Sequence, residues 1–278
     1  MCRLPGNGYV RREHIPSRHR RFPKRTLPTS GVRKGWTVIS DAFPRTPVSH
    51  IVVVVPAHNE QDLLDACLTA LARAQRRVMD AASVSVSTIV VLDACTDDSV
   101  RIAARHPSVS AIEVMHRNVG AARAAGFSSG SRDGGRLDAT WFATTDADTR
   151  VGEDWLLGHL RHAAEGARAV AGTVAVDFEG HVEDNLGLRT SYDAHYRHEF
   201  GHPHVHGANL GVRAAEYLAV GGFGPLATGE DHDLVRRLEL GGIECRRVCD
   251  IPVTTSGRLR GRAPDGMAGF LRALEATA

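Results

Sequence analysis

An uninterrupted run of β-branched residues, IVVVV at positions 51–55, constrains the fold of this chain more than any other feature of its sequence. Such a run is typical of a β-strand that is buried on both faces, as in parallel sheets covered by helices. The run stops at Pro56, and a helix opening at Asn59 follows, with apolar residues at helical spacing from Leu63 to Leu71. The pattern predicts a strand and then a helix.

The same alternation of strand and helix continues along the chain. It predicts a mostly parallel, Rossmann-like α/β sheet flanked by helices, in which ligands bind beyond the carboxyl ends of the strands. After residue 176 the pattern becomes less regular, so we expect a smaller, irregular second half. Further strands are predicted at residues 87–93, 111–115, 140–146 and 167–176, and helices at 97–105, 119–128, 230–240 and 267–274.

The beginning of the chain differs in charge from the rest. Residues 1–50 hold 11 Lys and Arg against 2 acidic residues, which leaves 23 against 30 beyond them. Residues 1–48 also lack an apolar period, so we expect a basic, disordered extension before a single domain at 49–278. Two interpretations of the extension stay open: a weak peripheral contact with anionic lipid, or a dispensable piece that includes a wrongly assigned start. No specific nucleic-acid partner is expected.

Neither a membrane span nor a secretion signal is recognisable in the sequence. No stretch approaches the roughly 20 consecutive apolar residues of a span, and the N-terminus lacks the apolar centre of a signal peptide. We therefore expect a cytoplasmic protein, with any membrane contact at the inner face. The cysteines are odd in number and lack Cys-x-x-Cys spacing, which favours reduced thiols. They are Cys2, Cys67, Cys95, Cys245 and Cys249.

Acidic or amide side chains follow three of the predicted strands. Asn59 and Glu60 follow the first, Asp93 ends the second, and Asp146 and Asp148 follow the fourth. A single carboxylate at a strand end is often only a helix cap or a turn former, but three such groups at one sheet edge indicate a site. The Asp-x-Asp pair offers hard oxygen ligands suited to Mg²⁺ or Mn²⁺ that also binds phosphate.

Two further segments carry groups suited to a nucleotide substrate. The small-residue segment from Arg117 to Arg123 opens a helix whose backbone N–H groups, with an arginine, can approach phosphate closely. Asp231 lies in Gly-Glu-Asp-His-Asp at another predicted helix start and is the candidate general base. Helix capping is the alternative explanation for that acidic cluster.

The order of these motifs resembles that of the family-2 glycosyltransferases with the GT-A fold. The matching motifs are PAHNE, DACTDDS, RNVGAARAAG, DAD, GANLG, GGF and TGEDHDL, within residues 51–240. The resemblance implies an inverting, metal-assisted transfer of a sugar from a nucleotide-diphosphate sugar to a hydroxyl acceptor, which is a saccharide, a lipid or a small molecule. It implies a donor half at about residues 49–150 and an acceptor half at about 151–278.

The resemblance also assigns roles to individual residues. Glu230 and Asp231 are the catalytic pair, with Asp231 as the base. Many enzymes of this fold add a late histidine to the metal, whereas no histidine follows His232 here, so Ser256 and Arg258 are expected to face the diphosphate, with Arg260 and Arg262. The nucleoside and donor contacts are Pro56, Asn59, Glu60, Asp93, Arg117, Asn118 and Gly120, the metal and diphosphate pair is Asp146 and Asp148, and the sugar or acceptor contacts are Gly207, Ala208 and Asn209.

Two alternative functions compete with this interpretation. His198, Glu199 and His202 match the H-E-x-x-H pattern of zinc hydrolases, although Gly201 and Pro203 disfavour the helix that this motif needs. The second alternative is a nucleotide-binding protein that has kept the fold and lost catalysis. The sequence does not identify the base, the sugar or the acceptor.

Overall fold

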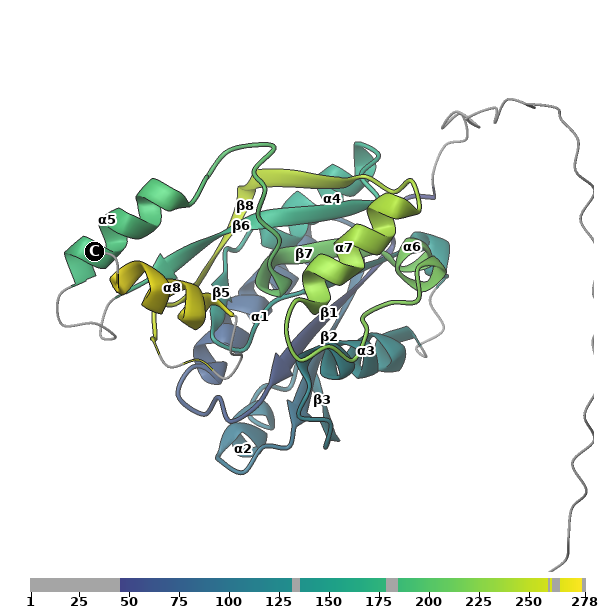
Figure 1. Ribbon diagram of the computed structural model, residues 1–278. Coiled ribbons are helices and arrows are strands. Elements are labelled where there is room, and N and C mark those ends of the chain that lie inside the picture. Colours follow the sequence, from purple (N-terminus) through teal and green to yellow (C-terminus); the bar gives the residue numbers. More distant parts are fainter. Residues whose placement is uncertain (1–45, 132–135, 179–184, 260, 262–265, 277–278) are drawn as a thin grey trace, which may run out of the picture. The chain divides into compact units, whose positions relative to one another are not determined.

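The computed structural model describes residues 46–131, 136–178, 185–259, 261 and 266–276. The predicted basic extension falls outside the described residues up to position 45, as do Arg260 and Arg262. The described residues share one eight-stranded sheet in the order β3-β2-β1-β4-β7-β6-β8-β5, which Figure 1 shows.

The first half of the sheet is parallel, as the sequence predicts. β1 pairs with both β2 and β4, and β2 pairs with β3, all in parallel. Their carboxyl ends therefore meet at one edge. These strands are β1 (His50–Ala57), β2 (Ser85–Asp93), β3 (Val109–Val114) and β4 (Thr140–Thr144).

The second half of the sheet is mixed. β7 runs antiparallel to β4 and β6, β8 runs parallel to β6, and β5 is antiparallel to β8. A register shift interrupts the pairing of β6 with β8 between Gly172 and Val174. These strands are β5 (Thr149–Val151), β6 (Ala169–Asp177), β7 (Leu210–Arg213) and β8 (Cys245–Ser256).

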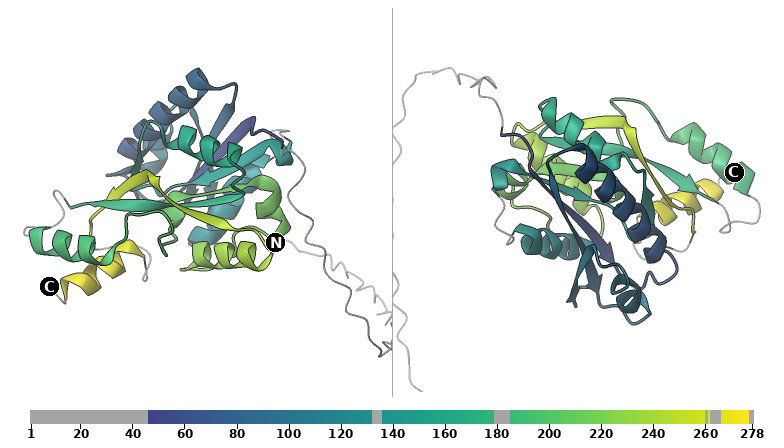
Figure 2. Two further views of the ribbon diagram at one scale, coloured as in Figure 1. Left: turned by 90° about the horizontal axis from the view of Figure 1, so that it is seen from above. Right: turned by 180° about the vertical axis from the view of Figure 1, so that it is seen from behind.

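Helices cover both faces of the sheet (Figures 1 and 2), and β1 shows why. Its residues Ile51, Val53 and Val55 pack into one core cluster with the apolar face of α1, whereas Val52 and Val54 face a second cluster beneath α3 and α7. All five are fully buried, which confirms the predicted two-sided burial. The helices are α1 (Leu64–Ala81), α2 (Ser99–Ala103), α3 (Val119–Gly130), α4 (Trp155–Ala164), α5 (Asn185–His195), α6 (Ala214–Ala219), α7 (Glu230–Leu240) and α8 (Met267–Glu275).

Several boundaries differ from the predicted ones. α1 begins at Leu64 rather than at Asn59, because Asn59 has a left-handed φ of 54° and the chain makes a turn before the helix. The segment after residue 176, predicted to be irregular, contains α5, which lies beside α8 at one end of the sheet (Figure 2). None of the helices in the described ranges is long and apolar enough to cross a membrane.

Candidate active site

The carboxyl edge of the parallel strands is marked by unusual backbone geometry. Asn59, Ala94 and Arg117 follow β1, β2 and β3, and have positive φ values of 54°, 52° and 48°. A left-handed conformation costs a non-glycine residue about 1 kcal/mol, and such strain concentrates at functional sites. Three strained turns at one edge agree with the predicted location of the site.

Asp93 organises the predicted nucleoside end of this edge. Its buried carboxylate accepts the backbone N–H groups of Arg117 at 2.8 Å and Asn118 at 2.9 Å. The Asn118 side chain caps α3 by accepting the N–H of Ala121 at 2.9 Å. Asp93 therefore fixes the turn that leads into α3, and two predicted donor residues, Arg117 and Asn118, are placed directly beside it.

Residues after β1 complete the nucleoside end. Asn59 accepts the backbone N–H of Thr96 through Oδ1 at 2.7 Å, which ties the turn after β1 to the turn after β2. Pro56 lies within β1 itself. Gly120 stands where a Cβ would lie 2.1 Å from the carbonyl oxygen of Gly224, so only glycine lets the start of α3 approach that segment.

Asp146 and Asp148 lie in the turn between β4 and β5, and each forms an ion pair with an arginine. Arg123 contacts Asp146 Oδ1 at 2.5 Å, and Arg258 contacts Asp148 Oδ2 at 2.6 Å. Burial raises the pKa of the Asp148 carboxyl to about 6, although Arg258 opposes the shift. Arg258 also binds Glu60 with two hydrogen bonds of 2.8 Å, so it bridges two predicted donor residues.

Arg123, which was not predicted as a site residue, lies at the centre of the predicted catalytic end, the groups around Asp146, Asp148 and the start of α7. Its side chain is 2% exposed and contacts Asp146 and Glu230 with its terminal nitrogens. Its Nε donates to Thr144 Oγ1 at 3.2 Å, and the guanidinium lies 5.6 Å from the Phe223 ring centre. The sequence signal that could have identified Arg123 is its position at the end of the small-residue segment that begins at Arg117. Small neighbours leave space for its long side chain to be buried.

The start of α7 presents the predicted catalytic pair, Glu230 and Asp231. Glu230 is buried, which raises the pKa of its carboxyl, while Arg123 opposes the shift. Asp231 accepts the backbone N–H of Gly207 through Oδ2 at 2.7 Å. His206 lies beside it, and burial lowers the pKa of His206 to about 4, so its imidazole is neutral at pH 7.

The predicted acceptor residues form a short 3-10 turn, Gly207–Asn209 (η3), before β7. Gly207 and Ala208 are buried beside Asp231 and Arg123. The Asn209 side chain points into the sheet, where it accepts Trp155 Nε1–H at 2.9 Å and donates to two backbone carbonyl groups. Asn209 therefore holds η3 against β6 and β8.

The carboxylates suit a divalent cation that arrives with phosphate. Among the described residues there is no group of three or more His, Cys, Asp or Glu side chains that could hold a metal ion. Mg²⁺ and Mn²⁺, however, commonly bind one or two protein carboxylates together with phosphate oxygens and water. Asp146 and Asp148 supply such a partial set, which a diphosphate would complete.

The zinc alternative finds no support in the structure. The segment that carries His198, Glu199 and His202 is not helical, so the two histidines do not lie on one helical face. Glu199 pairs with Arg197, and His202 donates through Nε2 to the carbonyl oxygen of Val248 at 3.1 Å. These contacts explain the residues without a metal.

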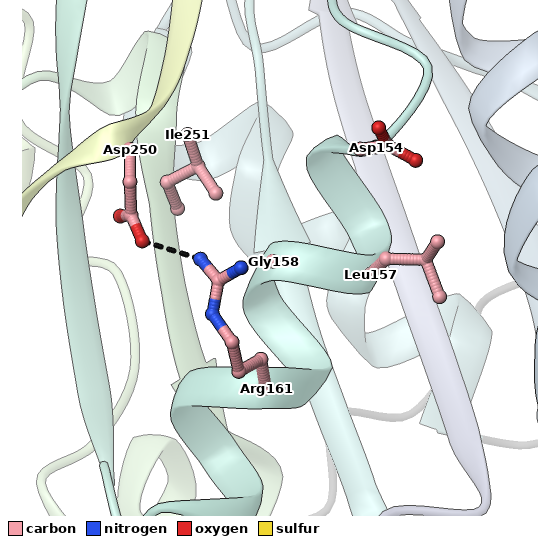
Figure 3. A pocket seen from close by; sticks show the side chains of 6 residues that line it. All are labelled: Asp154, Leu157, Gly158, Arg161, Asp250 and Ile251. Carbon is pink, nitrogen blue, oxygen red and sulfur yellow. Dashed lines mark hydrogen bonds and ion pairs between the residues drawn. The ribbon is translucent and has the colours of Figure 1, made fainter.

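A cavity of about 340 Å³ lies between α4 and β8, away from these groups (Figure 3). Arg161 forms an ion pair with Asp250 across it. None of the predicted site residues lines it, so we place the site at the sheet edge instead. The lining residues are Asp154, Leu157, Gly158, Arg161, Asp250 and Ile251.

Comparison with known families gives one match over most of the site. The family model described as "Glycosyl transferase family 2" matches residues 52–214, which is more than half of the chain. The matched segment includes Asp93, Arg123, Asp146 and Asp148. A search of curated proteins finds no significant match.

Solved structures with a similar fold include S. aureus TarS and a mannosyltransferase. Residues 1–349 of S. aureus TarS, in complex with UDP-GlcNAc, align with a TM-score of 0.57 and 15% identity over 78% of this chain and 61% of that one. The mannosyltransferase PcManGT from Pyrobaculum calidifontis, in complex with GDP-Man and Mn²⁺, aligns with a TM-score of 0.53 and 20% identity over 88% and 65%. This chain thus spans about three fifths of their length. At such identities the likeness concerns the fold, and it confirms the predicted GT-A architecture.

Proposed function

This chain belongs to glycosyl transferase family 2, and we propose that it is an inverting glycosyltransferase that moves a sugar from a nucleotide-diphosphate donor to a hydroxyl acceptor. Family membership supports the predicted enzyme class. The finer assignments below are proposals supported by the contacts at the site, and they keep the division that the resemblance implies, a donor half at about residues 49–150 and an acceptor half at about 151–278.

One observation carries the proposal: Arg123 joins the Asp-x-Asp turn to the start of α7. It contacts Asp146 on one side and Glu230 on the other. A donor whose diphosphate lies at Asp146 and Asp148 would therefore have its anomeric carbon near the residue that follows Glu230. That residue is Asp231, which makes it the proposed base.

The environment of Asp231 suits a base that removes a proton from a hydroxyl group. The N–H of Gly207 fixes Oδ2, and the N–H of His232 contacts Oδ1 at 2.7 Å. Each carboxylate oxygen keeps a second lone pair that can accept a hydrogen bond from the acceptor hydroxyl. As the hydroxyl oxygen attacks the anomeric carbon, its proton passes to Asp231 and the bond to the diphosphate oxygen breaks, so the configuration inverts.

We assign the donor to the edge built by β1, β2 and α3. The nucleoside would lie near Pro56, Asn59, Glu60 and Asp93, and the diphosphate would lie near the α3 start and Arg258. A divalent ion, Mg²⁺ or Mn²⁺, held by Asp146, Asp148 and the diphosphate, would offset charge on the leaving group. The presence of Mn²⁺ in the similar mannosyltransferase supports a metal of this kind.

Replacement of Asp231 by Asn tests the assignment. We expect Asp231→Asn to lower transfer by about 10³-fold, because the amide cannot accept the proton. Binding of UDP or GDP with Mn²⁺, measured by calorimetry, should stay within about twofold. Transfer is measured as nucleoside diphosphate released from a panel of UDP- and GDP-sugars with saccharide, lipid and small-molecule acceptors.

Asp233→Asn, two residues along the same helix, is the matched control, because Asp233 pairs with Arg237. It should keep full activity. Full activity in Asp231→Asn would overturn the base assignment. A wild-type protein that binds UDP or GDP and releases neither from any donor would instead be a binding protein without catalysis.

A further inference from the structure

Arg258 occupies an unusual position for a residue that faces a metal site. Its Nη2 lies 2.6 Å from Asp148 Oδ2, and its two terminal nitrogens hold both oxygens of Glu60 at 2.8 Å. The side chains of Arg258, Asp148 and Glu60 are only 21%, 16% and 9% exposed. The proposed metal ligand thus already has a cation, largely shielded from water.

A free divalent ion and Arg258 compete for the same carboxylate. A metal bound to Asp148 would sit about 2.1 Å from its oxygen, which places it within roughly 5 Å of the guanidinium. Two cations at that separation in a partly buried site repel each other strongly. The other oxygen, Asp148 Oδ1, accepts the hydroxyl of Thr255 at 3.3 Å and belongs to the same carboxylate, so a metal bound there would also lie close to the guanidinium.

A diphosphate removes this conflict. Phosphate oxygens can bind the metal and also accept hydrogen bonds from a guanidinium, which prefers such paired, charged acceptors. Among the described residues, the Arg258 guanidinium forms ion pairs with the Asp148 and Glu60 carboxylates alone, so it can turn toward a phosphate that replaces them. Arg123, with its four described partners and 2% exposure, is fixed.

We propose that Arg258 makes this site select a metal–nucleoside diphosphate complex over the free divalent cation. The inference rests on the proposed function. In the free protein Arg258 holds Asp148 and Glu60, and in the bound state the diphosphate lies between Arg258 and the metal. Metal and nucleotide therefore bind with strong mutual dependence.

Calorimetry with Mn²⁺ alone, and with Mn²⁺ plus UDP or GDP, tests the proposal in the full chain. Arg258→Met should bind free Mn²⁺ at least tenfold more tightly than the wild type, because the competing charge is gone. The same variant should bind the Mn²⁺–nucleotide complex at least tenfold more weakly. Opposite signs from one substitution would not follow from a general loss of structure.

Three variants serve as controls. Arg258→Lys keeps the charge and should keep weak binding of free Mn²⁺. Arg258→Gln removes the charge but retains a donor for Glu60, and it gives the same readout if Arg258→Met does not fold. Arg77→Met removes an exposed ion pair with Asp154 and should change neither affinity.

Unchanged affinity for free Mn²⁺ in both Arg258→Met and Arg258→Gln would overturn the inference, and so would unchanged affinity for the Mn²⁺–nucleotide complex. Failure of the proposed function gives a different result: the wild type would bind neither UDP nor GDP with Mn²⁺. The gain in free Mn²⁺ affinity on removing Arg258 would still report the competition in that case.

Discussion

The two ends of the proposed donor site hold their carboxylates in different ways. At the nucleoside end, Asp93 is held by two backbone N–H groups of the adjacent turn. At the catalytic end, Asp146 and Asp148 are held by arginine side chains from distant parts of the chain. A backbone amide leaves its acceptor only if the turn changes shape, whereas a side-chain ion pair can exchange partners.

This difference indicates that the two ends of the sheet edge have different roles in ligand binding. The nucleoside end is preorganised by bonds local to the turns, so a base would meet a surface that is already formed. At the proposed catalytic end the buried Arg123 is fixed, whereas the ion pair of Arg258 with Asp148 can exchange partners when a ligand binds. Such an arrangement suits the proposed transfer reaction. The rigid surface would bind the nucleoside, and the exchangeable ion pair would allow the diphosphate to bind and leave in every cycle.

The two ends also differ in how the backbone makes room. The nucleoside end uses left-handed non-glycine residues, Asn59, Ala94 and Arg117. The proposed catalytic end relies on close-packed glycines: a Cβ on Gly207 would lie 2.3 Å from Nη2 of Arg123, and one on Gly120, at the start of α3, would lie 3.1 Å from Cβ of Glu230. Close packing around one buried guanidinium thus replaces backbone strain.

Among the variants that test this comparison of the two ends, Gly207→Ala is expected to have the largest effect on stability and transfer. In Gly207→Ala the added methyl group must displace either Arg123 or η3, which breaks the contact between Gly207 N–H and Asp231. We expect a loss of about 2–3 kcal/mol in the free energy of unfolding, measured by urea denaturation. Transfer should fall by about 100-fold or more, since small misplacements of reacting groups have effects of this size.

Gly152→Ala is the matched control, because a Cβ there would meet nothing within 4 Å. It should leave both stability and transfer close to the wild-type values. Equal stability and transfer in Gly207→Ala and Gly152→Ala would mean that close packing around Arg123 does not distinguish the proposed catalytic end from the nucleoside end.

A smaller effect on stability should distinguish Asp93, which is held by backbone N–H groups, from Asp148, which is held by an arginine. Asp93→Asn replaces one acceptor oxygen by an NH₂ group and leaves a buried backbone N–H without a partner, which costs about 2 kcal/mol. Asp148→Asn removes one ion pair, but Arg258 keeps its two bonds to Glu60, so no buried charge is left alone. We expect its stability to change by less than about 1 kcal/mol.

Thermal and urea unfolding of both variants without nucleotide measures the contrast. The comparison fails if Asp148→Asn is as destabilised as Asp93→Asn. It becomes sharper if hydrogen exchange in Asp93→Asn increases only at Arg117, Asn118 and the start of α3.

The elements that the sequence predicts correctly are those with local signals. The valine run of β1 and the helix from Glu230 to Leu240 follow directly from composition and spacing, and both are confirmed. β5, β7 and β8 were not predicted, and in β8 Pro252 is a residue that argues against a strand inside a sheet. The structure places Pro252 where the pairing with β6 shifts register, so the ladder does not need its missing N–H.

The candidate site was predictable as a set of residues but not as a set of contacts. Strand ends gave Asp93, Asp146 and Asp148 because parallel strands bring their carboxyl ends together. The ion pairs of Arg123 with Glu230 and of Arg258 with Glu60 join residues 107 and 198 positions apart. No local sequence pattern encodes contacts over such separations. The partners of the two arginines could therefore be identified only from the fold.

The donor and acceptor halves also differ in the side chains that pack behind their strands. The donor strands β1 and β2 rest on aliphatic side chains, whereas β7 rests on His159 of α4, since a Cβ on Gly211 would lie 2.6 Å from its Nδ1. His159 is fully buried beside Trp141 and Trp155. Burial, with a smaller contribution from His162, lowers the pKa of His159 from 6.5 to about 3, and Asp250 opposes the shift. Acid should therefore weaken the acceptor half first.

The sign follows from the two pKa values. Between pH 6.5 and 3 the unfolded chain binds a proton at this position that the folded protein does not, so stability falls as the pH falls below about 6.5. From pH 7 to 5.5 this contributes about 1 kcal/mol. His159→Leu should lose that much less over the same range, whereas His195→Leu, at an exposed position, should behave as the wild type. Hydrogen exchange at pH 5.5 locates the effect: loss of protection in β1 and β2 as early as in β6 and β7 would contradict the contrast between the halves.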